Sequence, residues 1–205
     1  MRLGFNEAND RFCQGHTVMQ DLELCEKYGF DCIDIQSECL NRDLEKGIVT
    51  IEELGAWFAT HHLKMLSYNA LCFFNMKQTA EEKQAVMDEL DEIIRRCNIL
   101  GCKMIVVVPS QDMKARGLQP TRKEIREDAV AVLKEMVKKV EPHGIKLSLE
   151  FCGAPDMTIN RFEDAYAIVE AVDSPLVGVT LDQYHFYAMG SGWESLEKAD
   201  GKKIF

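Results

Sequence analysis

Two carboxylates and one histidine follow apolar runs in the later part of the chain. Glu150 ends the run in "LSLEF", Asp182 ends the run in "VGVTLD", and His185 comes three residues later. A buried carboxylate costs free energy unless something pairs with it. A divalent cation between the two would remove their mutual repulsion, and carboxylate oxygens suit Mg, Mn, Co or Zn, the last three often together with histidine. The alternative partner is an internal base such as Lys146, at the far end of the run before Glu150.

The other polar residues near these runs have both a chemical and a structural interpretation. His185 has aromatic neighbours that suggest a walled pocket and a contact with substrate, but it could equally be a loop histidine bonded to backbone. Asn6 and Asn69 end earlier apolar runs, where they could form turns or hydrogen-bond a polyhydroxy ligand. Asp156, shortly after Glu150, could face the pocket or only help to form a turn.

Strands and helices alternate along the chain and would position these residues. Apolar and β-branched runs predict strands over 2–6, 32–36, 64–70, 103–109, 146–151 and 177–182. Helical patterns occupy the intervals, over 17–28, 50–62, 80–100, 121–141, 160–172 and 192–199. Residues that favour helix N-caps stand at or next to the start of four of them, at Thr50, Thr79, Thr121 and Asn160. This alternation predicts an α/β fold with a mostly parallel sheet.

The two faces of the predicted strands separate a (β/α)8 barrel from a doubly wound open sheet. In five of the six strands one face is apolar, and the other is small or polar and most polar near its C-terminal end. An open sheet covered by helices on both sides should be apolar on both faces. No glycine-rich phosphate-binding motif follows any strand in the sequence. The pattern therefore predicts a TIM (β/α)8-type barrel whose C-terminal mouth holds Glu150 and Asp182.

The length of the chain predicts an incomplete barrel. A full barrel takes about 250 residues, whereas the 205 residues here hold six complete units and, in "GKKIF", the start of a seventh strand. We therefore expect a single domain over 1–205 that ends after about six βα units, with strands 7 and 8 missing. Because unpaired edge strands invite pairing with another chain, assembly into a homo-oligomer is a further prediction.

Composition and charge disfavour several classes of partner. Hydrophobic residues make up 46% of the chain and charged residues 28%, as in ordinary globular proteins. The net charge of -10 disfavours nucleic acid, which is bound largely through Lys and Arg. No run has the length of a signal-peptide core or a membrane span, which predicts a cytoplasmic protein without a membrane partner. The eight cysteines form no CxxC pair, which predicts reduced thiols, and no histidine at triad spacing accompanies Cys152 as a nucleophile.

The segment from "LSLEFCGAPD" to "GKKIF" resembles the sugar isomerase/epimerase family, whose members have xylose isomerase-like barrels. The stretches "LEF", "TIN-FEDAY", "LDxxHFxAMGS" and "ESLEKADGKKIF" carry most of the resemblance. "FNEA", "DLELCEKYG" and "NALCFFN" extend it over essentially the whole chain. Within the family, the likeness is greatest to the members that act on inosose (2-keto-myo-inositol) in inositol catabolism.

The resemblance implies an enzyme that isomerises or epimerises a small keto-sugar or inosose with a divalent metal ion (Mn, Co, Zn or Mg). It implies four metal ligands, of which Glu150 matches the first and Asp182 the second, while a histidine and a second glutamate would lie past Phe205. His185 matches a histidine that contacts the substrate. The implied reaction moves a proton through an enediolate, with Glu150 as a candidate acid or base. His185 would hydrogen-bond a substrate oxygen and balance the charge of the enediolate.

Two alternative functions stay open. One is a metal hydrolase like the abasic-site endonucleases of the same superfamily, which the acidic charge and the few ligand-type histidines disfavour. The other is a non-catalytic fragment with an incomplete barrel. Metal affinity, turnover of an inosose and nicking of DNA would separate the three functions.

Overall fold

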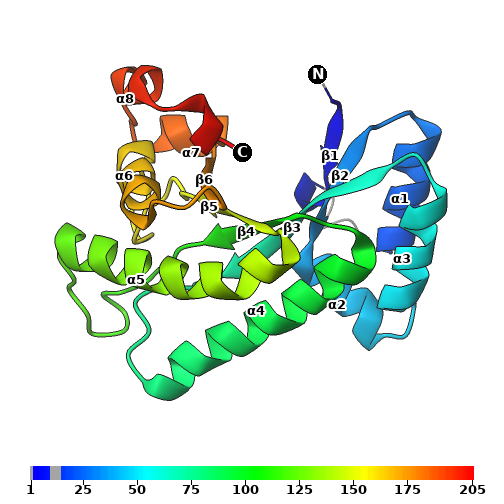
Figure 1. Cartoon of the computed structure of the whole chain (residues 1–205), viewed down its shortest axis with the longest axis horizontal. Coiled ribbons are helices and arrows are strands. Elements are labelled where there is room, and N and C mark those ends of the chain that lie inside the picture. Colours follow the sequence, from blue (N-terminus) through cyan, green and yellow to red (C-terminus); the bar gives the residue numbers. More distant parts are fainter. Residues whose placement is uncertain (1, 10–14) are drawn as a thin grey trace. The chain divides into compact units, whose positions relative to one another are not determined.

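The chain forms two compact units, and the boundary between them crosses three elements. The computed structural model describes residues 2–9 and 15–205. The first unit comprises Met1–Ala70 and Glu92–Ile105, and the second comprises Leu71–Asp91 and Val106–Phe205. Strand β3 (Lys64–Cys72), helix α4 (Ala80–Leu100) and strand β4 (Met104–Val108) each contribute residues to both units. The strands follow one another in chain order, β1-β2-β3-β4-β5-β6, and alternate with helices (Figure 1).

The first unit is built on parallel strand pairs. Besides its parts of β3, α4 and β4, it contains β1 (Gly4–Asn6), η1 (Glu7–Asn9), α1 (Val18–Lys27), β2 (Cys32–Gln36), α2 (Ser37–Glu45) and α3 (Ile51–Thr60). Strand β2 pairs in parallel with β1 on one side and with β3 on the other. The core of the first unit consists of fully buried apolar side chains from strands and helices, among them Leu22, Ile33, Ile35 and Leu54.

The second unit carries the last two strands and the helices that follow them. It contains α5 (Arg122–Val140), η2 (Glu141–His143), β5 (Lys146–Glu150), α6 (Phe162–Val172), β6 (Val177–Thr180), α7 (Gln183–Ala188), α8 (Trp193–Lys198) and η3 (Gly201–Lys203). Strands β5 and β6 are parallel neighbours, with Leu149 opposite Val179 and Glu150 opposite Thr180. Helix α6 packs on α5 and on both strands. Since parallel strands end at the same edge, the segments after β5 and β6 emerge side by side.

The alternation of apolar and polar side chains that the sequence predicts is present in β5 and β6. Leu147, Leu149 and Val179 are fully buried. On the intervening positions Ser148 Oγ bonds to Thr180 Oγ1 at 2.6 Å, and Glu150 is half-buried. The polar face therefore becomes more accessible toward the C-terminal ends of the strands.

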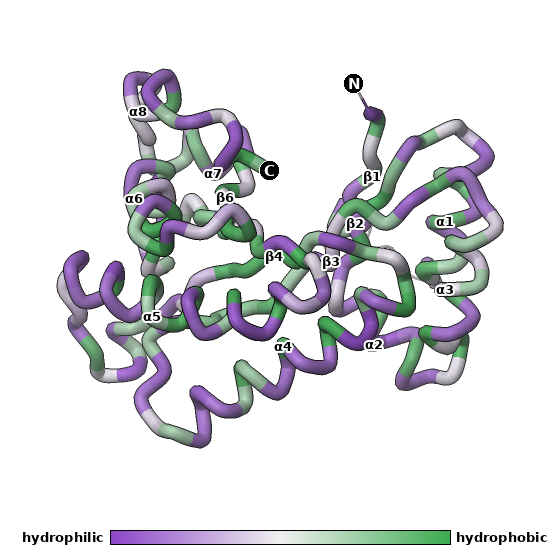
Figure 2. Tube along the Cα trace, viewed as in Figure 1, coloured by the Kyte–Doolittle hydropathy of each residue, from purple (hydrophilic) through white to green (hydrophobic). Residues whose placement is uncertain are grey.

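Hydropathy along the chain follows the elements. In Figure 2, β4 is hydrophobic throughout, whereas α4 and α5 alternate along their length between hydrophobic and hydrophilic residues. Helix α5 buries Ala129, Leu133, Met136 and Val140, which are three or four residues apart and so share one face. None of the helices in the described part of the chain is long and apolar enough to cross a membrane.

Several predicted boundaries agree with the structure. Helix α4 covers the predicted 80–100. Thr50 and Thr121 are N-caps and form capping boxes with the glutamates three residues later. Thr79 Oγ1 accepts the backbone N–H of Glu82. At the C-terminus, Ile204 forms a parallel bridge with Val179, as expected for the start of a strand next to β6.

Two predictions about elements are wrong, and two helices lie where none was predicted. Strand β6 ends at Thr180, two residues earlier than predicted, because Asp182 caps α7. Asn160 is not the N-cap of α6; the cap position is Arg161, and Ser191 Oγ accepts the N–H of Phe162 instead. The helical patterns also fail to predict α2, which starts directly after β2, and α7, which is too short for its periodicity to show.

The sequence predicts reduced cysteine thiols. Seven of the eight cysteines lie in the described part of the chain, and no disulfide joins any two of these seven. Cys13 lies outside the described residues. The expectation of a single domain over 1–205 stays a prediction.

Candidate metal centre

Glu150, Asp182 and His185 come together in the second unit. One potential ligand atom from each lies within 4.8 Å of those of the other two. The register explains this, because Glu150 is the last residue of β5 and lies opposite Thr180, the last residue of β6. Two residues after Thr180 the chain reaches Asp182, and the first turn of α7 carries His185.

Asp182 has a structural task that its position after a strand does not reveal. It is the N-cap of α7, and its Oδ1 accepts the backbone N–H of His185 at 2.9 Å. Aspartate is favoured at this position because its carboxylate satisfies an N–H that the helix leaves without a partner. The cap engages Oδ1 and leaves Oδ2 outside this hydrogen bond.

His185 is held through its ring as well as through its backbone. Its Nδ1 accepts the backbone N–H of Gly153 at 3.0 Å. Its Nε2 lies 3.9 Å from Oε1 of Glu150, which is too long for a direct hydrogen bond. Tyr184 packs edge-on against the ring, with the ring centroids 5.4 Å apart. Nε2 therefore points toward Glu150 and can donate to a third group.

The cluster is partly buried, and its surroundings are negatively charged. The side chains of Glu150 and His185 are 17% and 25% exposed. Burial raises the pKa of the Cys152 thiol to about 12, and the carboxylates of Glu150 and Asp182 contribute to the rise together with Cys72. Negative charge that disfavours a thiolate favours a cation in the same place.

Lys146, the internal base that could have paired with Glu150, contacts another residue. It lies at the opposite end of β5, and its Nζ stands 4.2 Å from the centroid of the Phe205 ring. This cation–π contact does not neutralise the cluster of carboxylates at the other end of the strand.

The remaining predicted site residues lie elsewhere. Asn6 is exposed, and its Oδ1 accepts the N–H of Ala8 at 2.9 Å, which is the turn interpretation of that residue. Asn69 is half-buried in β3 and, like Asn6, belongs to the first unit. A substrate contact by either asparagine stays a prediction.

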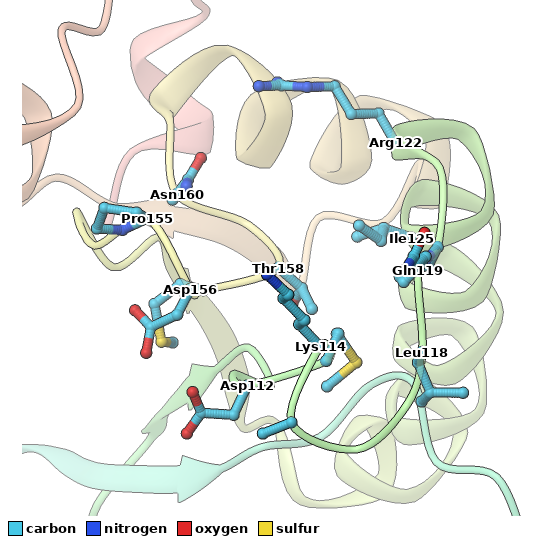
Figure 3. A pocket seen from close by; sticks show the side chains of 14 residues that line it. Asp112, Lys114, Leu118, Gln119, Arg122, Ile125, Pro155, Asp156, Thr158 and Asn160 are labelled. Atoms are coloured by element: carbon cyan, nitrogen blue, oxygen red, sulfur yellow. The ribbon is translucent and has the colours of Figure 1, made fainter.

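Asp156 is exposed and lines a pocket of about 1020 Å³ whose lining does not include Glu150, Asp182 or His185. Its carbonyl accepts the N–H of Asp112 at 3.1 Å. Figure 3 shows Asp112 and Asp156 on one side of this pocket and Arg122 and Ile125 on the other. A role of Asp156 in substrate binding stays a prediction.

Gly153 contributes to the candidate metal centre, although the sequence pattern did not identify it as a site residue. A Cβ at this position would lie 2.7 Å from the carbonyl oxygen and 2.8 Å from Cα of His185. Glycine is thus required for the segment after β5 to approach α7. The available signal was a glycine three residues past the end of a strand that carries a candidate ligand.

Comparison with known proteins identifies the family. The family model "Xylose isomerase-like TIM barrel" matches residues 22–205. The chain belongs to this family. Inosose isomerases of Bacillus velezensis and Bacillus subtilis are each 40% identical over 205 residues, which cover 100% of this chain and 70% and 71% of theirs.

Solved structures agree with this assignment. The crystal structure of an IOLI protein with a bound zinc atom is 40% identical, has a TM-score of 0.91, and is matched over 100% of this chain and 70% of its own. A D-psicose 3-epimerase from Clostridium cellulolyticum with D-tagatose, 18% identical with a TM-score of 0.71, shares the fold. The α/β fold of TIM-barrel type is thereby confirmed, in a chain that spans about 70% of the length of these relatives.

Proposed function

We propose that the chain carries the first part of the active site of a metal-dependent isomerase that acts on an inosose or a related keto-sugar. The observation that supports this most strongly is the cluster of Glu150, Asp182 and His185. It lies in a chain that is 40% identical over its whole length to inosose isomerases.

The donor set of the cluster fits a divalent metal ion. Glu150 and Asp182 offer carboxylate oxygens, and the raised pKa of Cys152 indicates the negative charge that a cation would offset. Carboxylates suit Mg, Mn, Co or Zn, and further ligands would complete a zinc coordination of four. When bound, the metal polarises a substrate carbonyl and thereby acidifies the neighbouring C–H bond.

The residues of the chain divide the remaining work between them. Glu150, at the end of β5 and only 17% exposed, is the candidate group that takes a proton from carbon and returns one to the adjacent carbon through an enediolate. His185 directs Nε2 toward the same space and would donate a hydrogen bond to a substrate oxygen that gains charge. Asp182 would hold the metal through Oδ2 while Oδ1 keeps α7 in place.

The test combines calorimetric titration with Zn or Mn and an assay of inosose isomerisation that follows exchange of the substrate C–H proton in D₂O. Glu150→Gln should lower the rate by about 10² to 10⁴, as expected when a general base is lost, and should weaken metal binding. Glu170→Gln, on the exposed surface of α6, is the control and should leave both unchanged. If the Glu150→Gln variant exchanges the substrate proton at a rate within a few-fold of the parent, Glu150 is not the general base. If the parent chain shows neither metal binding nor exchange, the proposed function is overturned.

A further inference from the structure

The backbone of Gly153, in the loop after β5, contacts the ring of His185 in the first turn of α7. The N–H of Gly153 donates to Nδ1 of His185 at 3.0 Å. The missing side chain makes this possible, because a Cβ on Gly153 would overlap the backbone of His185 at 2.7 and 2.8 Å and meet Cβ of Ala188 at 3.0 Å. The two nearest atoms belong to the backbone of His185 in α7, which cannot move aside as the end of a flexible side chain could.

The direction of this hydrogen bond decides where the imidazole carries its proton. A backbone N–H can only donate, so Nδ1 must accept with its lone pair. In a neutral ring the proton then resides on Nε2. The backbone of His185 is fixed separately, because Asp182 Oδ1 accepts its N–H at 2.9 Å.

A histidine that ligates a metal has the opposite arrangement. It gives the lone pair of one ring nitrogen to the metal and donates the N–H of the other to a carbonyl or carboxylate. In His185 the lone pair of Nδ1 is used by Gly153, and Nε2, which faces Glu150 at 3.9 Å, carries the proton. The ring can therefore donate a hydrogen bond next to Glu150 but has no lone pair to offer a metal there.

We propose that Gly153 is a positioning residue that holds His185 in the Nε2–H form, which excludes it from the metal and reserves it as a hydrogen-bond donor. The donor role toward a substrate oxygen rests on the proposed function. The ring form itself does not, because it follows from Gly153, His185 and the cap of α7 alone.

The first test is long-range ¹H–¹⁵N NMR of the imidazole, recorded on the protein without added metal and again with zinc. The resonances of His185 are identified by their disappearance in His185→Gln. We expect an unprotonated Nδ1 that accepts a hydrogen bond and a protonated Nε2, with the same pattern after zinc is added. A protonated Nδ1, or loss of the Nε2 proton on addition of zinc, would overturn the proposal.

The second test uses two substitutions, each of which keeps a hydrogen-bonding group near one of the two ring nitrogens. His185→Asn keeps an acceptor near Nδ1 and loses the donor at Nε2, whereas His185→Gln keeps an amide donor near Nε2. Both should bind zinc within a few-fold of the parent, and His185→Gln should isomerise inosose about tenfold or more faster than His185→Asn. Asp182→Asn is the comparison, because asparagine still caps α7 but lacks the charge for zinc.

Gly153→Ala tests the positioning residue itself. It should change the ¹⁵N pattern of His185 and lower kcat more than it raises KM, while zinc affinity through Glu150 and Asp182 persists. Gly201→Ala is the matched control, because a Cβ there meets nothing within 4 Å. If Gly153→Ala does not fold, the NMR pattern and the His185 pair still decide the matter.

The outcomes separate this inference from the proposed function. If both His185 variants lose zinc as Asp182→Asn does, His185 is a ligand and the inference fails while the isomerase proposal stands. If the NMR pattern is as expected but neither parent nor variants isomerise inosose, the ring form stands. In that case the proposed function and the donor role fail.

Discussion

At the scale of single residues, Cys152 reports the charge of the cluster. Its thiol is partly buried beside Glu150, and burial together with the nearby negative charges raises its pKa to about 12, which disfavours the reactive thiolate. A cysteine in this state is a poor nucleophile, which agrees with the absence of a partner histidine at triad spacing in the sequence. The thiol is therefore more useful as a probe of its neighbours than as a catalytic group.

Glu150→Gln should accelerate alkylation of Cys152 at pH 8. After burial, the Glu150 carboxylate is the largest cause that raises the pKa of this thiol. Removal of that charge lowers the pKa and increases the thiolate fraction at a fixed pH. Mass spectrometry after timed exposure to iodoacetamide measures the rate, and Glu170→Gln, on the exposed surface of α6, is the control that should leave it unchanged. Equal rates for Cys152 in parent and variant would show that Glu150 does not set its charge environment.

At the scale of elements, helix caps set where several helices begin. Thr50 Oγ1 accepts the backbone N–H of Glu53, and the Glu53 carboxylate accepts the backbone N–H of Thr50 at 2.7 Å. At the other end of the same helix α3, Thr60 Oγ1 bonds to two carbonyls of the preceding turn and to Nδ1 of the neighbouring His61 and caps no helix N-terminus. The two threonines thus differ in energetic role although both are exposed.

Thr50→Ala should reduce the free energy of unfolding by about 1 kcal/mol, the usual contribution of an N-cap. Thr60→Ala should change it by less than about 0.5 kcal/mol, as for other surface sites. Urea denaturation followed by tryptophan fluorescence in a Trp193→Phe background makes the measurement, because Trp57 in α3 is then the single reporter. A loss for Thr60→Ala as large as that for Thr50→Ala would contradict the assignment.

At the scale of the whole molecule, net charge distinguishes the proposed isomerase from a nuclease. The chain has 34 acidic and 24 basic residues, which gives a charge of -10. Counterion release, the main source of affinity for DNA, needs Lys and Arg against phosphates.

The chain should not bind or nick DNA at physiological salt. Fluorescence anisotropy with a labelled duplex that contains an abasic site measures binding, and a gel assay with Zn, Mn or Mg measures nicking. Titration at low salt is the control for weak charge-driven contacts, which salt should abolish. Metal-dependent nicking that Asp182→Asn removes would favour the hydrolase over the isomerase.

Local patterns in the sequence determined the alternation of strands and helices, the extent of α4 and three of the four predicted caps, at Thr50, Thr79 and Thr121. These features depend on residues within a few positions of one another, through side-chain periodicity and the unpaired groups of helix ends. The same local information was too little for α2 and α7, where one helix directly follows a strand and the other spans six residues. The types and order of Glu150 and Asp182 also sufficed to predict a candidate metal site at the end of the strands.

Only the tertiary structure decided how that site is arranged. It made Asp182 a helix cap, placed Lys146 against Phe205, and brought the N–H of Gly153 to a ring 32 residues away. These contacts depend on the register of β5 against β6 and on the close approach of a loop backbone to α7. Neither is encoded in the spacing of neighbouring residues, because a side chain takes its orientation from the segments that pack around it.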